Sequence, residues 1–426
     1  MDTTNVSKNT NRSYVLAILF VVMMLNFIDR QIISILAEPI KRDMGLSDSQ
    51  IGLMTGLSFA LFYTTLSIPI AAIADRWNRS KIIAIAVAVW SIMTVLCGAA
   101  SNFIQLFLAR VGVGIGEAGS SPASHSLIAD LYPPEKRSSA LGILAISVSV
   151  GYFIAYTGGG WMVEHIGWRK AFLVAGLPGA FLAILIWFTV RDPRGDKSIA
   201  EAFKPIKGEV TLLEAVKELS VKPAYWHLVA AGAAISFVAY GAQTFYAPYF
   251  IRIHELGYQE LGLKLGLMVL IFGSLGAWLG GKLGDYFNTR LLGGSLLGGA
   301  AALLIAIPGL YFGMYAENPD VAMLCLGIPK AAFSFWYGPC FSTVQLLASD
   351  RTRALAIAIW LFFSGLVGLG LGPLSVGILS DMFAAGVPGA DGPALQKAIF
   401  VIGLFNIVAA LFFVLAQRRL KKDSVA

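Results

Sequence analysis

The sequence predicts an all-α membrane protein built from two similar six-helix bundles. Of its 426 residues, 57% are hydrophobic and only 13% are charged, and the mean hydropathy is +0.73. A soluble domain carries about 25% charged residues, so this composition indicates a chain that resides in lipid. A charged signature also occurs twice between long apolar runs, first at Asp75, Arg76 and Arg79 and again at Asp285 and Arg290. A repeat of this kind indicates two homologous bundles that face each other.

Twelve apolar runs are long enough to cross a membrane, because a spanning helix needs about 20 such residues. They lie at 14–37, 50–74, 80–100, 103–128, 139–162, 169–190, 225–251, 261–284, 291–314, 321–347, 353–380 and 397–416. Six runs precede a polar segment and six follow it. This order predicts an N-terminal bundle over 1–190, a linker over 191–224, and a C-terminal bundle with a basic tail over 225–426. In the linker, Thr211 and Glu214 have capping-box spacing, which predicts a short amphipathic helix on the membrane surface.

The positions of lysine and arginine predict the orientation of the chain. They concentrate in loops on the same side as both termini, so the positive-inside rule predicts cytoplasmic termini. The net charge of +7 is therefore interpreted as a topology signal and not as a nucleic-acid surface. The three cysteines, Cys97, Cys325 and Cys340, lie in apolar runs and are expected to be packing residues, without a metal site or a cofactor. The first apolar run lacks a cleavage-like end, so no removable signal peptide is expected.

Five ionisable side chains inside the spans are the candidate functional residues, because burying a charge in a membrane is costly. Span 1 contains Asp29 and Arg30, span 4 contains Arg110 and Glu117, and span 10 contains Lys330. Spans 1 and 4 run in opposite directions. The helical rise places Asp29 and Arg110 at similar depth, and Glu117 about 10 Å deeper on nearly the same face. Two acids and two bases are therefore expected to meet on one wall.

This arrangement suggests a proton switch. Desolvation and a nearby arginine act in opposite directions on a buried acid, so its protonation can respond to physiological pH. Glu117 is the first candidate for the proton carrier and Asp29 the second, with Arg30, Arg110 and Lys330 as charge partners of a substrate. The alternative is a permanent salt bridge between spans 1 and 4, and Lys330 has the further alternative of extending to the outer interface.

Aromatic side chains are the candidate apolar wall beside these charges. The residues concerned are Tyr63, Tyr156, Phe335, Trp336 and Tyr337. An amphipathic ligand needs such a wall, although aromatic residues in membrane proteins also face lipid or pack between helices.

The repeated signature resembles the loop motif of the major facilitator superfamily, Gly-x-x-x-Asp-Arg-x-Gly-Arg-(Arg/Lys). Asp75, Arg76 and Arg79 match it in the first copy, and Asp285 and Arg290 match it in the second. The resemblance implies the fold of that superfamily, with twelve helices in two pseudo-symmetric bundles, and transport by alternating access. It also implies that these five residues form a cytoplasmic gate. The alternative is that they contribute topology charge alone.

Three segments resemble the Spinster-like branch of this superfamily, which handles lysolipids and sphingoid lipids. They are 26–30 (Asn-Phe-Ile-Asp-Arg), 110–118 (Arg-Val-Gly-Val-Gly-Ile-Gly-Glu-Ala) and 130–134 (Asp-Leu-Tyr-Pro-Pro). The short tails indicate a bacterial member, located in the inner membrane. The resemblance implies a monomeric, proton-coupled transporter whose partners are the bilayer, protons and a small amphipathic molecule that is anionic or zwitterionic.

Two other functions stay open at this stage. A proton-coupled symporter of a small organic acid would use the same three basic residues. A scramblase-like lipid pathway is an alternative of another class, and it would run without a proton gradient. An enzyme is not expected, because the sequence has no Walker motif, metal-ligand cluster or nucleophile–base pattern.

Overall fold

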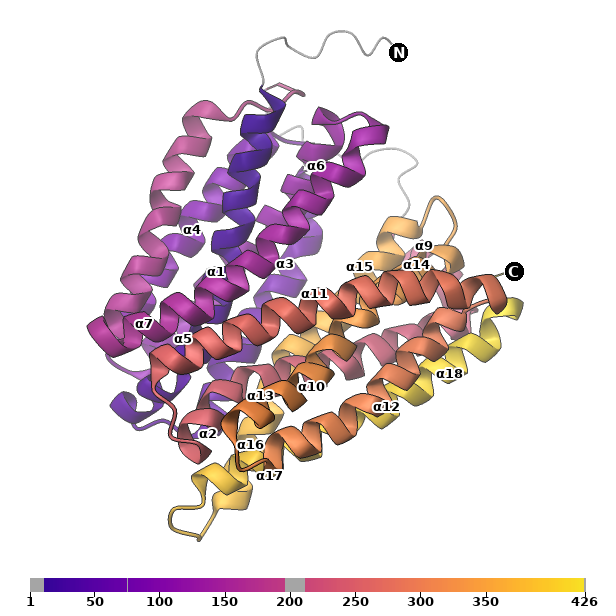
Figure 1. The fold of residues 1–426 in the computed structure, drawn as a ribbon. Helices are drawn as coiled ribbons and strands as arrows, with labels where there is room; N and C mark the ends of the chain where they lie inside the picture. The colour runs from indigo at the N-terminus through magenta and orange to yellow at the C-terminus, as the bar shows by residue number, and fades with distance from the viewer. Residues whose placement is uncertain (1–10, 75, 196–210, 425–426) are drawn as a thin grey trace.

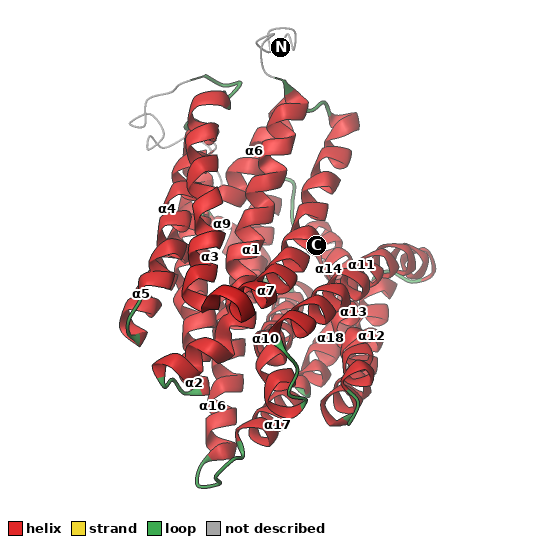
Figure 2. Cartoon of the chain, turned by 60° about the vertical axis from the view of Figure 1, so that its left-hand side comes forward, coloured by secondary structure: helices red, strands yellow, loops and turns green. Residues whose placement is uncertain are grey.

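Two groups of helices, which diverge from a shared region of contact, make up the computed structural model of this protein (Figures 1 and 2). The structure describes residues 11–74, 76–195 and 211–424, and all regular structure within these ranges is helical. We refer to α1–α7 as the N-terminal half and to α10–α18 as the C-terminal half.

The helices of each half follow one another in the order of the chain. The N-terminal half comprises α1 (Arg12–Met44), α2 (Asp48–Gly52), η1 (Leu53–Leu57), α3 (Ser58–Ala74), α4 (Arg79–Ala99), α5 (Phe103–Glu117), α6 (Ser120–Leu131) and α7 (Pro134–Thr189). The short helix α9 (Leu212–Ser220) follows. The C-terminal half comprises α10 (Pro223–Ile253), α11 (Tyr258–Arg290), α12 (Gly294–Tyr315), α13 (Pro319–Phe335), α14 (Tyr337–Leu347), α15 (Arg353–Phe363), η2 (Ser364–Leu371), α16 (Gly372–Ala384), α17 (Asp391–Gly403) and α18 (Phe405–Asp423).

These helices supply twelve membrane crossings. Ten helices of the described chain are long and apolar enough to span a bilayer. One of them, α7, contains two crossings that meet at Gly167, where φ is +79°, a conformation that only glycine adopts at little cost. The consecutive helices α5 and α6 form one further crossing. The structure therefore confirms the predicted all-α fold with twelve spans.

Local sequence explains where several helices begin. Asn78, which stands where the superfamily signature has its second glycine, is the N-cap of α4 and accepts a hydrogen bond from the Lys81 N–H. Ser47 and Gln50 form a reciprocal capping box at the start of α2. The predicted Thr211–Glu214 pair does the same for α9, with the Thr211 N–H 2.9 Å from the Glu214 carboxylate.

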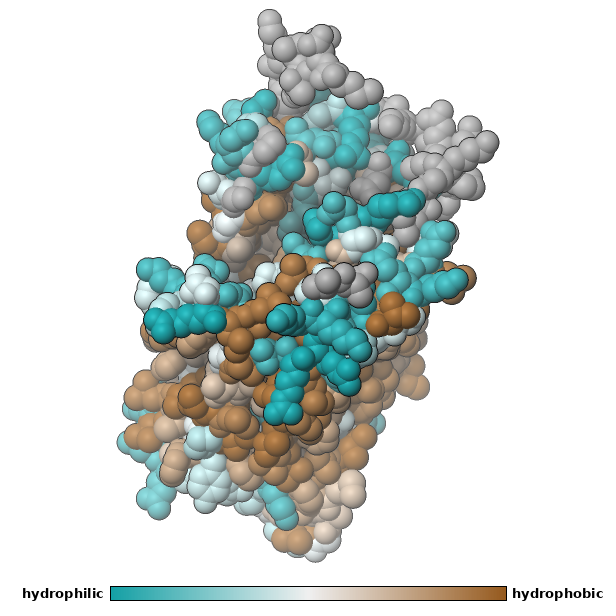
Figure 3. All heavy atoms as spheres, turned by 90° about the vertical axis from the view of Figure 1, so that its right-hand side faces the viewer, coloured by the Kyte–Doolittle hydropathy of each residue, from teal (hydrophilic) through white to brown (hydrophobic). Residues whose placement is uncertain are grey.

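The outer surface suits a lipid environment. Large apolar side chains project from many helices, among them Ile104, Phe181 and Phe188, which are 67%, 70% and 77% exposed. Figure 3 shows apolar residues over much of the lower part of one face, with polar residues above them. Exposed aliphatic and aromatic groups on this scale are favourable only in contact with lipid or a partner.

The two halves meet through three sets of helices: α1 with α10, the α2–η1–α3 segment with α15, η2 and α16, and α7 with α11. Gly52 and Gly160 lie at two of these contacts, and each lets a backbone carbonyl of the other half approach closely. We use "distal" for the end of the molecule near α2, α16 and α17, and "proximal" for the opposite end, where α1 begins and α18 ends (Figure 1). The halves approach at the distal end and diverge toward the proximal end.

Candidate functional site

A buried ion pair joins α1 to α5 in the middle of the N-terminal half. The Arg30 guanidinium donates to the Glu117 carboxylate with Nη2–Oε2 and Nε–Oε2 distances of 2.6 and 3.2 Å. The side chain of Glu117 is completely buried and that of Arg30 is 9% exposed. The second oxygen of Glu117, Oε1, has no hydrogen-bond partner within the described chain. This carboxylate is therefore fully buried and paired with Arg30 through one of its two oxygens.

Asp29 and Arg110 lie next to this pair, so all four predicted charges come together. Arg110 donates to the backbone carbonyl of Asp29 at 3.4 Å and not to its carboxylate. Among the described residues, Asp29 Oδ1 and Arg110 Nε have no hydrogen-bond partner. Both side chains are 1% exposed. The four groups carry no net charge when both acids are ionised, and protonation of either acid would leave the cluster with a net charge of +1.

Aromatic rings hold the Arg30 guanidinium in place. Its central carbon lies 5.1, 4.8 and 4.6 Å from the ring centroids of Phe27, Phe59 and Tyr63. Cation–π contacts in a desolvated site contribute roughly 1–2 kcal/mol each. Arg30 thus retains favourable contacts when the charge of Glu117 is removed.

A chain of hydrogen bonds crosses from one half to the other beside this cluster. Gln31 donates to the Tyr152 hydroxyl at 3.3 Å and accepts from Gln243 of α10 at 3.0 Å. The Lys330 ammonium donates to the Gln243 side-chain carbonyl at 3.4 Å and lies 5.1 Å from the centre of the Tyr152 ring. Lys330 therefore points into the molecule, toward the contact between the halves.

A small pocket between the halves connects these groups. Its walls come from α1, η1, α10 and η2. Most of the residues that line it are polar, and they include Arg30, Gln31, Ser34, Thr55, Gln243 and Thr244. A second, more apolar cavity lies within the C-terminal half and is bordered by Gln243 and Lys330. The described residues thus place Arg30 and Lys330 at two neighbouring cavities that share Gln243.

The other predicted aromatic residues occupy different environments. Tyr156 is 1% exposed at the contact between the halves, where its carbonyl faces Gly262. Phe335 and Trp336 are buried among helices of the C-terminal half, where the Trp336 and Trp360 ring centroids lie 5.5 Å apart. Neither Phe335 nor Trp336 lines either of the two cavities above. Tyr337 is 48% exposed.

The repeated signature contributes a buried clamp in the N-terminal half. Arg79, which is 0% exposed, donates to Asp192 at 2.9 Å, to Asp130 at 2.8 Å and to the carbonyl of Ser126 at 2.9 Å. Burial disfavours ionisation of Asp192, but the hydrogen bonds from Arg79 outweigh it and hold the pKa of Asp192 below its usual value. These partners all belong to the N-terminal half. Arg79 therefore ties the proximal ends of α4 and α6 to the segment after α7.

Less is described of the remaining signature residues. Asp75 lies outside the described residues. Arg76 forms at least one interaction of its own. Arg290 lies over the ring of Tyr286, one residue beyond Asp285, at 4.8 Å. The predicted role of these residues as a cytoplasmic gate stays a prediction.

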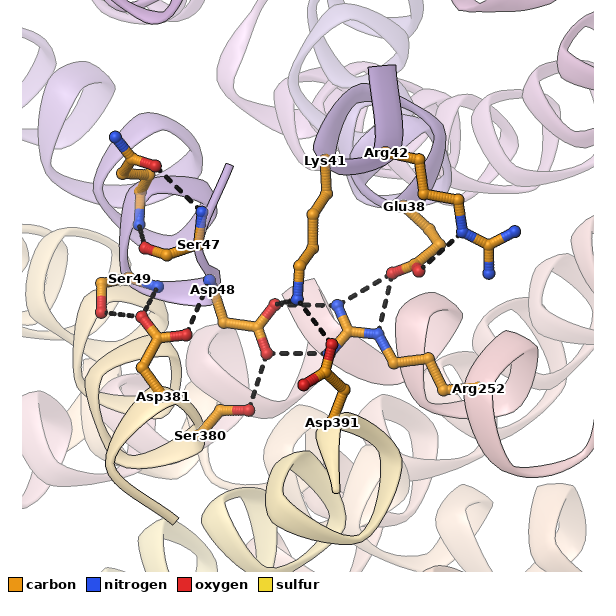
Figure 4. A network of polar contacts seen from close by, with 11 residues as sticks. Glu38, Lys41, Arg42, Ser47, Asp48, Ser49, Arg252, Ser380, Asp381 and Asp391 are labelled. Atoms are coloured by element: carbon orange, nitrogen blue, oxygen red, sulfur yellow. Dashed lines mark hydrogen bonds and ion pairs between the residues drawn. The ribbon is translucent and has the colours of Figure 1, made fainter. Parts of the chain in front are cut away.

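A dense charge network closes the distal end (Figure 4). Arg252, at the end of α10, binds Asp48 with two hydrogen bonds of 2.8 Å and also pairs with Glu38 at 2.8 Å. Lys41 and Ser380 bind the same Asp48 carboxylate at 2.8 and 2.6 Å. Asp48, Glu38 and Lys41 belong to the N-terminal half, whereas Arg252 and Ser380 belong to the C-terminal half. Within the described residues, this network therefore connects the halves on the distal side of the pocket that lies between them.

Comparison with known proteins agrees with this architecture. Residues 19–373 match the family model of the Major Facilitator Superfamily. The chain belongs to the major facilitator superfamily. As a member of it, the protein is an integral membrane transporter and not an enzyme.

Among major facilitators, the chain resembles Spinster-like transporters. It is 33% identical to a bacterial homologue of the human lysosomal transporter Spinster, whose crystal structure is inward-facing and unoccupied. The match has a TM-score of 0.85 and covers 98% of this chain and 99% of that one. An MFS-type efflux pump from Mycolicibacterium smegmatis is 33% identical over 96% of this chain and 93% of its own length. Spinster homolog 1 from Xenopus tropicalis is 24% identical over 96% of this chain and 81% of its own length.

Several residues of this major facilitator site have no strong signal in the sequence. Gln31 and Gln243 are uncharged, so a search for ionisable side chains inside the spans does not select them. Glu38, Asp48 and Arg252 lie near the ends of spans, where charges are common for reasons of topology. The internal repeat is the sequence feature that could indicate the distal contacts, because a residue of one half predicts an equivalent residue in the other half.

Proposed function

We propose that this protein is a proton-coupled secondary transporter that moves an anionic or zwitterionic amphipathic molecule by alternating access. The observation that carries the proposal is the buried cluster of Asp29, Arg30, Arg110 and Glu117, in which Arg30 borders the pocket between the halves. Buried ionisable groups of this kind in a transporter are typical of proton relays.

In the proposed cycle, protonation of Glu117 weakens its ion pair with Arg30. Arg30 stays in place because Phe27, Phe59 and Tyr63 surround it, and it gains the freedom to bind an anion. A proton on Glu117 and an anionic group on Arg30 are then bound in the same state. Asp29 is the second candidate for the proton, since its carboxylate is buried beside Arg110 without a full set of partners.

The proposed substrate class follows from both charge and apolar surface. Arg30 and Lys330 provide two cations that suit a phosphate or carboxylate headgroup, and the cavity bordered by Lys330 has apolar walls. Lysolipids and sphingoid lipids are the first substrates to test, because the Spinster-like resemblance points to them. A small organic acid is the second candidate, favoured by the polar lining of the pocket at Arg30.

Proteoliposomes with a pH-sensitive dye inside provide the test. Under an imposed proton gradient, a lysolipid is added first and a small organic acid second. We expect lysolipid-dependent proton movement that is lost in Glu117→Gln, which preserves the shape of the side chain and removes its charge. Glu135→Gln, at an exposed acid on the proximal side, is the matched control and should behave like the wild type.

Each other outcome has a defined meaning. Proton movement with the small acid alone would transfer the function to the organic-acid symporter. Lipid movement without a proton gradient would indicate a scramblase-like pathway. Unchanged coupling in both Glu117→Gln and Asp29→Asn would refute the proton assignment.

A further inference from the structure

A carboxylate from the C-terminal half caps a helix of the N-terminal half. Asp381, in α16, accepts hydrogen bonds from the N–H groups of Asp48 and Ser49 at 3.0 and 2.8 Å and from the Ser49 hydroxyl. Figure 4 shows Asp381 directed at the first turn of α2. The helix that begins there continues through η1 and α3 as one span, Asp48–Ala74. An acid at the N-terminus of such a helix satisfies free N–H groups and interacts favourably with the helix dipole.

The opposite arrangement occurs at the other contact between the halves. Glu164, in α7 of the N-terminal half, accepts a hydrogen bond of 2.9 Å from the Gln259 N–H. Gln259 lies in the first turn of α11, which belongs to the C-terminal half and begins at Tyr258. Each half therefore supplies an acid that caps a spanning helix of the other half.

The two caps share a local pattern. A glycine precedes each acid by four residues: Gly377 before Asp381 and Gly160 before Glu164. A Cβ atom at Gly377 would lie 2.2 Å from the Asp48 carbonyl oxygen, and one at Gly160 would lie 2.2 Å from the Tyr258 carbonyl oxygen. The glycines thus allow the backbones to approach until the acids reach the helix ends.

The spacing along the chain shows that the caps are related by the internal repeat. Gly377 follows Gly160 by 217 residues, and Asp381 follows Glu164 by the same number. The capped helices also correspond, because Asp48 is the first residue of its span and Tyr258 is the first residue of α11. One glycine–acid device is therefore present in both halves.

We propose that Asp381 and Glu164 form a distal lock, a pair of helix caps between the halves that stabilises the state in which the distal ends are closed. When the distal ends separate, the N–H groups of Asp48 and Ser49 lose their acceptor. The Ser47–Gln50 capping box remains, because both of its residues lie in the N-terminal half. This inference rests on the alternating access proposed above, but it requires neither the substrate nor proton coupling.

Electron spin resonance distances between paired labels test the lock in the full-length protein. The three native cysteines are first replaced. Labels on Ser101 and Val387 then report the distal separation of the halves, and labels on Glu135 and Arg351 report the proximal separation. All four positions are exposed.

Two variants remove the caps, Asp381 and Glu164, and a third removes Asp43, an acid that pairs within its own half. We expect Asp381→Ala to raise the ratio of distal-open to distal-closed molecules by roughly 5- to 10-fold, since it removes a charged cap. Glu164→Ala should raise the ratio by roughly two- to threefold, because Glu164 is exposed and makes one such bond. Asp43→Ala is the control, because Asp43 pairs with Arg169 of its own half.

Hydrogen exchange at the Gln259 amide, whose acceptor Glu164 is retained in Asp381→Ala, provides a second readout, which detects opening even when the open fraction is small. Faster exchange in Asp381→Ala than in Asp43→Ala supports the lock. Equal exchange and equal distances in these two variants would overturn it. If Asp381→Ala does not fold, Asp381→Asn keeps an acceptor oxygen, removes the charge and should show a smaller shift in the same direction.

The two proposals fail separately. The distances and the exchange rates require neither substrate nor a proton gradient, so an absent lock leaves the Glu117 assignment intact. Unchanged proton movement in Glu117→Gln would refute the coupling and leave the lock standing.

Discussion

A single methyl group at Gly160 should weaken the closed distal contact. In Gly160→Ala the new Cβ would lie 2.2 Å from the Tyr258 carbonyl oxygen, whereas real Cβ contacts stay above 3.0 Å. The helices must therefore move apart by about 0.8 Å. Both groups in conflict belong to the backbone, so no side chain can rotate to relieve the contact. Overpacking of this kind costs about 1–3 kcal/mol.

The cost falls on the state in which α7 and α11 touch. If the distal-open state does not have this contact, the ratio of open to closed molecules rises by roughly 5- to 150-fold, since about 1.4 kcal/mol corresponds to a factor of ten. The label pair on Ser101 and Val387 measures this ratio. Gly142→Ala is a matched control in the same helix, because a Cβ at Gly142 would meet nothing within 4 Å.

The comparison between Gly160→Ala and Gly142→Ala tests whether α7 and α11 form this close contact in the distal-closed state. A shift in the distance distribution for Gly160→Ala and none for Gly142→Ala supports a tight contact that opens during transport. Equal behaviour of the two variants would show that α7 and α11 do not approach in solution as closely as the structure has them. That result would also remove the steric basis of the glycine–acid pattern.

Three further predictions concern the charged groups. Arg79→Met leaves the buried Asp192 carboxylate without its main partner and should lower the free energy of unfolding by about 3–5 kcal/mol, measured by thermal unfolding in detergent; Arg42→Met, at a side chain that is 62% exposed, should have little effect. Because the folded-state pKa of Asp192 is lowered, the contribution of Asp192 to the free energy of unfolding should be complete near neutral pH and should fall as the pH drops below about 4. The melting temperature of Asp192→Asn should then depend less on pH than that of the wild type. An equal dependence would contradict the lowered pKa of Asp192. Lys330→Met should raise the KM for an anionic substrate more than Lys330→Arg does, because arginine keeps the charge and can still reach Gln243; equal KM values for the two variants in an uptake assay would show that the charge does not bind substrate.

The twelve spans could be predicted because the required length of apolar sequence is fixed by the thickness of the bilayer. The helical rise also placed the charges of spans 1 and 4 on one wall. It did not identify the pairs: Glu117 binds Arg30, whereas Arg110 contacts the backbone of Asp29. Helical rise gives depth along the membrane, but the choice of partner depends on the rotation of each helix and on side-chain length.

The distal contacts could not be predicted in the same way. Asp48, Arg252 and Asp381 lie near helix ends, where solvated charges are common and carry little information about contacts. Whether they meet depends on how the two halves pack, which no local pattern specifies. The repeat contains more information, since Gly160 with Glu164 and Gly377 with Asp381 have the same internal spacing. A comparison of the two halves residue by residue would have identified the pair as related, though not as caps.

The positions of the two polar systems suggest how protonation could be linked to movement. The Arg30–Glu117 pair lies entirely within the N-terminal half, so a rigid-body rotation of the halves leaves it intact. The bond from Gln243 to Gln31 joins the halves and must change in the same rotation. Gln31 directly follows Arg30 in α1, so the release of the Arg30 guanidinium from its ion pair upon protonation of Glu117 takes place next to the bond that the rotation changes. Because Gln243 also accepts from Lys330, an anion that binds both cations would compete for this bond at the point where the halves join.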